Sequence, residues 1–469
     1  MQKLDENFEI KKDKYDFKTN IKPVYQVGQG LTRSVVEEIS RVKKEPEWMK
    51  NIRLRALEIF NSKPLPTWGP DLSELNFDEI TYYIKPDDRK SSSWDEVPKE
   101  IKETFDKLGV PEMERKYLAG TVAQFESEGV YSKIKKQWEE KGVIFMDMDS
   151  ALQKYPEIIR EHFGKVVPAS DNKFAALNTA VWSGGSFLYI PKGVHVDLPV
   201  QAYFRMNGEL EGQFERTLIV AEEGASVHYI EGCTAPTYSR YALHAAVVEV
   251  YAKKNSKVRY TSIQNWSDNV INLPTKRAWV EENARMEWVQ GSLGSKITMT
   301  YPSSILRGEY ASTSNLNVAL AMGEVWKDNG AKVVHAAPNT SSKVVAKSIS
   351  GRGGMSVYRG LLRINQGAYN SKSSVQCDAL IVDDISKSNT YPHNEILDDT
   401  SVFSHEASVG KISEEQINYL MSRGIREEDA RSLIVLGFLD DVLKEIPLEY
   451  SIEFNKLIRL EMSKMGAVG

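Results

Sequence analysis

Thiol chemistry is the first candidate for function, because the sequence contains only two cysteines, Cys233 and Cys377. Two cysteines this far apart make neither a disulfide framework nor a zinc ribbon. They fit a reducing compartment, in which each thiol is either part of the core or reactive. Free cysteine is among the most buried residue types, so residue type alone favours a core role for both.

The motifs of nucleotide-dependent and hydrolytic enzymes are absent from the sequence. It has no GxxxxGK[ST] phosphate loop, so we do not expect this chain to hydrolyse ATP in that manner. HExxH, GxSxG and CxxC do not occur, and Gly28-Gln29-Gly30 does not complete a dinucleotide-binding fingerprint. We therefore predict that the chain is not an enzyme in its own right.

Charge and hydropathy narrow the function classes further. A formal net charge of −5 argues against a general nucleic-acid binder, which carries a basic surplus. The first residues, MQKLDENFEIKKDKYDFK, carry charges throughout and lack the apolar core of a secretory signal. No stretch approaches 18 uninterrupted apolar residues, so we expect no membrane span. These features together predict a cytoplasmic protein.

Three regions must position the candidate residues. Residues 1–165 contain helical patterns, one of them following Ser34, a good N-cap residue. Residues 166–405 lose the long helical patterns and contain short alternating runs typical of strands, such as RTLIVA and AAVVEVYA. Residues 406–469 are helical again, opening at the capping residue Ser413 and ending in LEYSIEFNKLIRLEMSKM.

A repeat in the middle region predicts its fold. A turn residue, one or two small polar residues and an alternating strand recur every 28 to 31 residues or so. A steady period in strand-forming sequence is typical of stacked coils that share one core. A β-sandwich, the competing fold, is not expected to keep such a period. We predict a mostly β protein with a right-handed parallel β-helix body. The repeats begin at Gly193, Gly224, Asn255, Asn283, Ala311, Asn339 and Gly367.

Many phrases of the sequence resemble the SufB family of iron–sulfur cluster assembly scaffolds. The matches follow the family order through nearly the whole chain. They include EPEWMKNIRLRALEIF, YIPKGVHVDLPVQAYFRMN, YIEGCTAP followed by LHAAVVEV, YRGLLRINQGAYNSKSSVQCDALIVDD and FSHEASVGKISEEQINYLMSRG. The resemblance implies an N-terminal mixed region, a parallel β-helix body and a C-terminal helical domain, in agreement with the three regions above.

The resemblance also implies a function and a set of partners. The chain would be a scaffold on which a transient iron–sulfur cluster, [4Fe–4S] or [2Fe–2S], is assembled. Its body would pair with a SufD-like paralogue or with itself, and residues 406–469 would dock a SufC-like ABC-type ATPase. A cysteine desulfurase and a sulfur-transfer protein would supply sulfur, and carrier proteins would accept the cluster. Reduced flavin is a further candidate cofactor.

Candidate sulfur-handling residues follow from the matching motifs. Cys233, in the turn-like phrase EGCTAP, matches the family's sulfur acceptor, for which a thiolate attacking a persulfide is the natural chemistry. Polar residues in YFRMN, IQNW and TKR match positions expected along a sulfur path, with solvated or capping roles as the alternative. A cation near Cys233 would lower its pKa. These polar residues are Arg205, Asn207, Gln264 and Lys276.

The iron ligands are the point at which the sequence departs from the family. Ser386 stands where many members carry a second cysteine, and serine is a poor iron ligand. His405 and Glu406 match a family His-Glu pair and are the candidate non-thiol ligands, with Asp384 as another carboxylate. Cys377 is a candidate substitute, although its strand context favours a structural role. Two cysteines cannot make a four-cysteine site, so a cluster would need mixed ligands or a second subunit.

Two other functions remain open from the sequence. A SufD-like structural subunit would lack the acceptor cysteine, so the EGCTAP phrase disfavours it. A carbohydrate-active β-helix enzyme would need clustered acidic residues on one coil face, and the repeats offer no such set.

Overall fold

The structure is a computed structural model of the chain. It describes residues 16–208 and 210–445, together with Ser451, Asn455, Ile458, Arg459 and Met462. The final helix predicted over residues 448–465 therefore lies largely outside the described residues. Most of the charged N-terminal phrase lies outside them as well.

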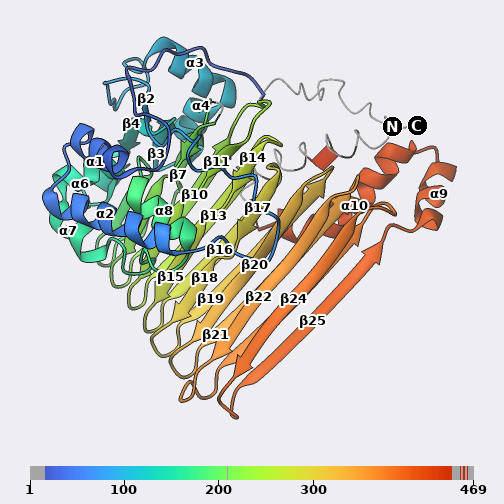
Figure 1. The fold of residues 1–469 in the computed structure, drawn as a ribbon. Helices are drawn as coiled ribbons and strands as arrows, with labels where there is room; N and C mark the ends of the chain where they lie inside the picture. Colours follow the sequence, from blue (N-terminus) through green and yellow to red (C-terminus); the bar gives the residue numbers. More distant parts are fainter. Residues whose placement is uncertain are drawn as a thin grey trace.

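Most of the protein is a β-solenoid of about eight turns, which confirms the predicted fold class. Its strands stack side by side in two long sheets (Figure 1). The neighbours along the solenoid are parallel. The first sheet contains β7 (Val200–Arg205), β10 (Ser226–Thr234), β13 (Lys257–Asn265), β16 (Arg285–Ser292), β19 (Ser312–Met322), β21 (Ser341–Gly351), β23 (Lys372–Ile381) and β25 (Val402–Lys411).

The second sheet supplies the opposite wall of each coil. Its main strands are β6 (Ser186–Ile190), β9 (Arg216–Ala221), β12 (Val247–Ala252), β15 (Thr275–Val280), β18 (Ser303–Leu306), β20 (Trp326–His335), β22 (Met355–Ile364) and β24 (Lys387–Ile396). A row of shorter strands joins the same sheet through β20. These are β8 (Gly212–Gln213), β11 (Ala242–His244), β14 (Val270–Asn272) and β17 (Ile297–Thr300).

Each coil turns at a residue in the left-handed backbone region, which explains the repeat. Six of the seven predicted starting residues have φ between 54° and 85°, and all six are glycine or asparagine. These two residue types tolerate that conformation best. At the remaining repeat the left-handed residue is Tyr310 (φ 60°), so the predicted start at Ala311 is wrong by one position. The side-chain Nδ2 of Asn283 donates a hydrogen bond to Oδ1 of Asn255 at 2.8 Å, which links consecutive coils.

The lumen of the solenoid is apolar along the first part of each coil. In β10, Val227 and Tyr229 point inward, and Tyr229 stacks on Tyr260 of β13 with ring centroids 5.0 Å apart. The same alternation continues along β10 to two polar residues, Glu231 and Cys233. The inner face of this strand therefore changes from an apolar core to a polar site within a few residues.

The N-terminal region packs around the first coils (Figure 1). Its β3 and β4 extend the first sheet beyond β7, and β5 pairs with β6 of the second. The strands are β1 (Tyr25–Gln26), β2 (Ile84–Lys85), β3 (Gly120–Phe125), β4 (Glu128–Ile134) and β5 (Ile144–Asp147). The helices are α1 (Arg33–Val42), α2 (Glu47–Ser62), α3 (Lys99–Leu108), α4 (Val110–Tyr117), α5 (Lys136–Glu139), α6 (Met148–Lys154), α7 (Pro156–His162) and α8 (Lys173–Val181).

Two details of the helices differ from the sequence prediction. The N-cap of α1 is Thr32 and not Ser34, because Thr32 is extended and its hydroxyl accepts a hydrogen bond from the Val35 amide. Helix α8 lies in residues 166–405, where the sequence shows no long helical pattern. All of its residues after Lys173 are buried, so it lacks the apolar stripe of an amphipathic helix.

The C-terminal helices α9 (Glu414–Ser422) and α10 (Glu427–Leu443) follow the last strand. The Ser413 hydroxyl caps α9 by accepting from the Gln416 amide, as predicted. Helix α10 buries Val435 and Leu439 in a cluster with outward-facing residues of the first sheet, whereas Leu433 is 45% exposed. Core packing therefore accounts for one face of α10, whereas the apolar side chain of Leu433 lies outside this packing and is exposed. No helix among the described residues is long and apolar enough to cross a membrane.

Candidate functional site

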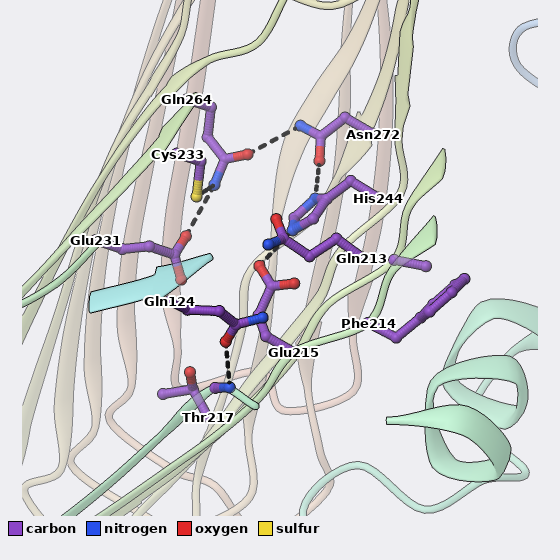
Figure 2. A network of polar contacts seen from close by, with 12 residues as sticks. Gln124, Gln213, Phe214, Glu215, Thr217, Glu231, Cys233, His244, Gln264 and Asn272 are labelled. Atoms are coloured by element: carbon purple, nitrogen blue, oxygen red, sulfur yellow. Dashed lines mark hydrogen bonds and ion pairs between the residues drawn. The ribbon is translucent and has the colours of Figure 1, made fainter. Parts of the chain in front are cut away.

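Cys233 lies inside the solenoid, on the inner face of β10. Its neighbour on the next coil is Gln264 of β13, whose side-chain amide nitrogen is 3.6 Å from the Cys233 sulfur (Figure 2). The phrase around Cys233 is not a turn, as the sequence suggested, because pairing with β7 and β13 holds it in strand conformation as far as Thr234. Only 1% of Cys233 is exposed, so no external group reaches it in this conformation.

Glu231, two residues before Cys233, is the charged centre of the site. Its carboxylate accepts hydrogen bonds from Ser262 Oγ and Gln264 Nε2, each at 2.8 Å, and from the Tyr260 hydroxyl. Lys276 reaches it from β15 in the opposite sheet, with Nζ 3.0 Å from Oε1. Burial acts to raise the pKa of Glu231, but Lys276 and the hydrogen bonds outweigh it and hold the pKa below its ordinary value. The carboxylate is therefore ionised and paired.

The net shift in the pKa of Cys233 is upward, although a nearby cation acts to lower it. Burial raises it well above the ordinary value, and the charges of Glu231 and Glu215 raise it further. Lys276 acts to lower it, as predicted for a nearby cation, but its charge is already engaged by Glu231. The resting form of Cys233 is consequently a protonated thiol.

A chain of hydrogen bonds continues from Gln264 across the lumen (Figure 2). Gln264 Oε1 accepts from Trp266 Nε1 at 2.7 Å and from Asn272 Nδ2 at 3.1 Å. Asn272 Oδ1 lies 2.6 Å from His244 Nδ1, and the other His244 nitrogen contacts the Glu215 carboxylate. Burial acts to lower the pKa of His244, but Glu215 outweighs it and the net shift is upward. A second buried ion pair, Glu215–His244, therefore lies at the other end of this chain of hydrogen bonds from Glu231.

Apart from Tyr260 and Ser262, which contact Glu231 from β13, motif matching missed five residues of this network: Glu215, Glu231, His244, Trp266 and Asn272. A usable signal exists for Glu231, because period-two alternation from Tyr229 places it on the same face as Cys233. The others belong to separate short strands or loops, whose positions across the lumen depend on how the coils close.

The contacts that the structure describes for Arg205 and Asn207 are with an N-terminal segment. The Arg205 guanidinium donates to the Phe17 carbonyl at 2.5 Å and lies 4.7 Å from the Phe17 ring centroid. The Asn207 side chain bonds both the amide and the carbonyl of Thr19, each at 2.8 Å. Of the four polar residues matched to a sulfur path, the structure thus brings Gln264 and Lys276 to Cys233. The other two hold an N-terminal segment against the solenoid wall.

Cys377 occupies a second site, close to the last coil. It is on β23, and its sulfur lies 3.5 Å from Nε2 of His405 on β25. Burial raises the pKa of Cys377 to about 12, with the Tyr358 hydroxyl bond acting in the opposite direction. Glu406 is exposed and, as the next residue along the strand, points to the other face of the sheet. The structure therefore brings Cys377 and His405 together without Glu406.

Ser386 lies in the turn before β24, where its hydrogen bonds go to neighbouring turn residues. Its hydroxyl accepts a hydrogen bond from the Gly353 amide at 2.9 Å, and its own amide donates to Asp383 at 2.8 Å. Asp384 is exposed and ion-paired with Lys411. Within the described part of the chain, no group of three or more histidine, cysteine, aspartate or glutamate side chains is arranged to hold a metal ion.

Comparison with known proteins agrees with this architecture. Residues 204–438 match the family model described as the SUF system FeS cluster assembly, SufBD core domain, and residues 35–202 match the SufBD protein N-terminal region. Relatives from Staphylococcus haemolyticus, Staphylococcus aureus and Staphylococcus epidermidis carry the name iron-sulfur cluster assembly SufBD family protein. Each is 56% identical over 456 residues, covering 97% of this chain and 98% of the relative. The chain belongs to the SufBD family of iron–sulfur cluster assembly proteins.

Proposed function

We propose that the chain is the SufB-like scaffold subunit, which receives sulfur on Cys233 for cluster assembly. The observation that supports this proposal is the set of charged and polar side chains around that thiol. An inward-facing cysteine is surrounded by an ionised Glu231, a buried Lys276 and an amide donor from Gln264. Buried charges are costly, so a purely structural lumen would be filled more simply by apolar side chains.

The sulfur-transfer step needs the thiolate form of Cys233. The thiol loses its proton, and the thiolate attacks the outer sulfur of a persulfide on the donor. The donor's S–S bond breaks, its own cysteine leaves as a thiolate and takes up a proton, and Cys233 carries the persulfide. The raised pKa of Cys233 opposes this step at rest. Turning Lys276 from Glu231 toward the sulfur would favour it, because a nearby cation stabilises the thiolate.

Cluster assembly would then use the other end of the solenoid. Cys377 and His405 are a thiol and an imidazole at contact distance, and both are iron ligands when deprotonated. Two ligands are too few for a cluster, so the remaining ones would come from Glu406 after rearrangement or from a second subunit. β24 and β25 are largely exposed, with Tyr391, Val402 and Val409 uncovered. A SufD-like paralogue or a second copy would cover this surface.

The other partners follow from the family. A SufC-like ABC-type ATPase would dock on α9 and α10, where Tyr419 and Leu433 are exposed. A cysteine desulfurase and a sulfur-transfer protein would supply sulfur in a reducing, cytoplasmic compartment, and carrier proteins would take the [2Fe–2S] or [4Fe–4S] cluster. The chain itself would act as a scaffold and not as an enzyme. A requirement for reduced flavin is a separate prediction, tested by omitting flavin from the assembly reaction.

Anaerobic transfer and reconstitution test the proposal. Wild type, Cys233→Ser and Cys377→Ser would be incubated with a cysteine desulfurase, cysteine and iron, and then examined by peptide mass spectrometry and Mössbauer spectroscopy. We expect Cys233→Ser to lose the persulfide and the cluster, and Cys377→Ser to keep the persulfide but lose iron. His405→Ala should lose more iron than Glu406→Ala. If Cys233→Ser assembles clusters like wild type, with its ATPase present, the SufD-like structural role replaces the scaffold role.

A further inference from the structure

A cavity of about 350 Å³ lies outside the solenoid and plays no part in the site above. Three parts of the chain line it: the loop after α2 (residues 63–68), the start of α8, and outward-facing residues of the second sheet near β15 and β20. A volume of this size is within the range of small-molecule sites in proteins. The cavity is formed at the junction between the N-terminal region and the solenoid.

The cavity wall carries more positive than negative charge. Its one carboxylate, Asp171, is engaged by Arg277 at 2.9 Å. The Lys173 ammonium donates only to the carbonyls of Phe60 and Lys63, at 2.8 Å and 2.6 Å. Among the residues that the structure describes, no carboxylate forms an ion pair with Lys173 or with Lys332. Lys173 and Lys332 therefore have no ion-pairing carboxylate of their own among the described residues, and the more distant Asp171 is shared between Lys332 and Arg277.

Both lysines are in surroundings that disfavour their charge. Burial lowers the pKa of Lys173. Burial also lowers the pKa of Lys332, and repulsion from Arg277 and Arg359 adds to this effect, whereas Asp171 offsets only part of it. A bound anion would offset this cost, because an opposite charge nearby favours the protonated lysine. The chemistry of the wall thus fits a negatively charged ligand.

An aromatic surface adjoins these cations. Trp68 is 46% exposed, and its ring centroid lies 5.9 Å from that of Tyr301. The Arg359 guanidinium lies 4.7 Å from the Trp68 ring and is held there by Asp328 at 3.0 Å. Lys332 lies 5.4 Å from the Tyr301 ring centroid. An exposed indole beside a second ring is suited to stacking with a planar group.

We propose that this cavity binds a small planar anion of mononucleotide size, with its negative group at Lys332 and Lys173 and its ring against Trp68. This assignment rests on two lysines without an ion-pairing carboxylate and an exposed aromatic ring in one cavity. The proposal is independent of the sulfur chemistry at Cys233, which lies inside the lumen.

Isothermal titration of the full chain with adenosine 5′-monophosphate tests the proposal, with inorganic phosphate as the ring-free probe. We expect wild type to bind the nucleotide with a dissociation constant below about 1 mM. Lys332→Gln should weaken nucleotide and phosphate binding about tenfold or more. Trp68→Leu should weaken nucleotide binding about fivefold while leaving phosphate binding unchanged.

Lys343→Gln is the matched control, because this lysine lies on β21, away from the cavity, and should bind like wild type. Thermal unfolding of each variant would show that it is folded. The proposal is overturned if wild type does not bind the nucleotide in this range. It is equally overturned if Lys332→Gln and Trp68→Leu bind the nucleotide as tightly as wild type does.

Discussion

The two cysteines occupy similar positions in the same sheet but very different surroundings. Both are buried on the inner face of strands of the first sheet, and the pKa of both is raised. Cys233 lies deep in the lumen beside two buried ion pairs, Glu231–Lys276 and Glu215–His244. Cys377 lies one strand from the end of the solenoid, with only Tyr358 and His405 as polar contacts described for its sulfur. One thiol is surrounded by charge, and the other is near an uncovered edge.

Under the proposed function, this contrast would let one repeating scaffold support two kinds of chemistry. The coil geometry is the same at both sites, so the side chains on the inner face decide the local chemistry. Charge that surrounds Cys233 can control when its proton leaves. The uncovered edge near Cys377 lets a second molecule contribute groups to it. Sulfur acceptance therefore fits the first site, and a shared metal site fits the second.

The largest expected effect comes from breaking the ion pair beside Cys233. Lys276→Met leaves the Glu231 carboxylate buried without its cation, so we expect a loss of about 3–5 kcal/mol in the free energy of unfolding. The double variant Lys276→Met with Glu231→Gln removes both charges and should recover most of this loss. Urea denaturation measures both values.

Tyr358→Phe, beside Cys377, is the matched change at the other site. It removes one neutral hydrogen bond and should cost only about 1 kcal/mol. Equal losses at the two sites would show that the charged surroundings of Cys233 have no special energetic role.

Substitutions at the coil turns should cost similar free energies of unfolding in both halves of the solenoid. Asn255 and Asn339 are both left-handed, with φ of 60° and 56°, so replacing either with alanine should cost about 1–2 kcal/mol. Asn→Gly at the same positions should be much milder, because glycine adopts this conformation without strain. Thermal unfolding measures the four variants. A large cost in one half alone would contradict the view that the scaffold is uniform.

A smaller effect is expected from the pH dependence of the Glu215–His244 pair. The folded-state pKa of His244 is raised, so its stabilising effect is fully present below the unfolded pKa of about 6.5 and is lost as pH rises through the folded pKa. Wild type should therefore exceed His244→Gln in stability by the widest margin near pH 6, with a narrower margin near pH 9. A margin that grows with pH would show that His244 is neutral in the folded protein.

The fold was predictable from the sequence because its determinants are local. The turn residues Gly193 and Asn255 recur at a steady period, and alternation along β10 places Glu231 with Cys233. The candidate site was only partly predictable, since Lys276 reaches Glu231 across the lumen from another sheet. One partner of Arg205 is Phe17, far away in the sequence, and no local pattern indicates that contact.

The most direct test of the account measures persulfide formation on Cys233 and the alkylation rate of each cysteine as functions of pH, in wild type and in Glu231→Gln. Peptide mass spectrometry after exposure to a cysteine desulfurase and cysteine, or to an alkylating reagent, would follow the two sites separately. Removing the Glu231 charge removes one cause of the raised pKa of Cys233, so the pH profiles of Cys233 should shift to lower pH while the alkylation profile of Cys377 stays unchanged. Absence of persulfide on Cys233, or equal shifts at both cysteines, would contradict the claim that Cys233 is a sulfur acceptor controlled by its buried charges.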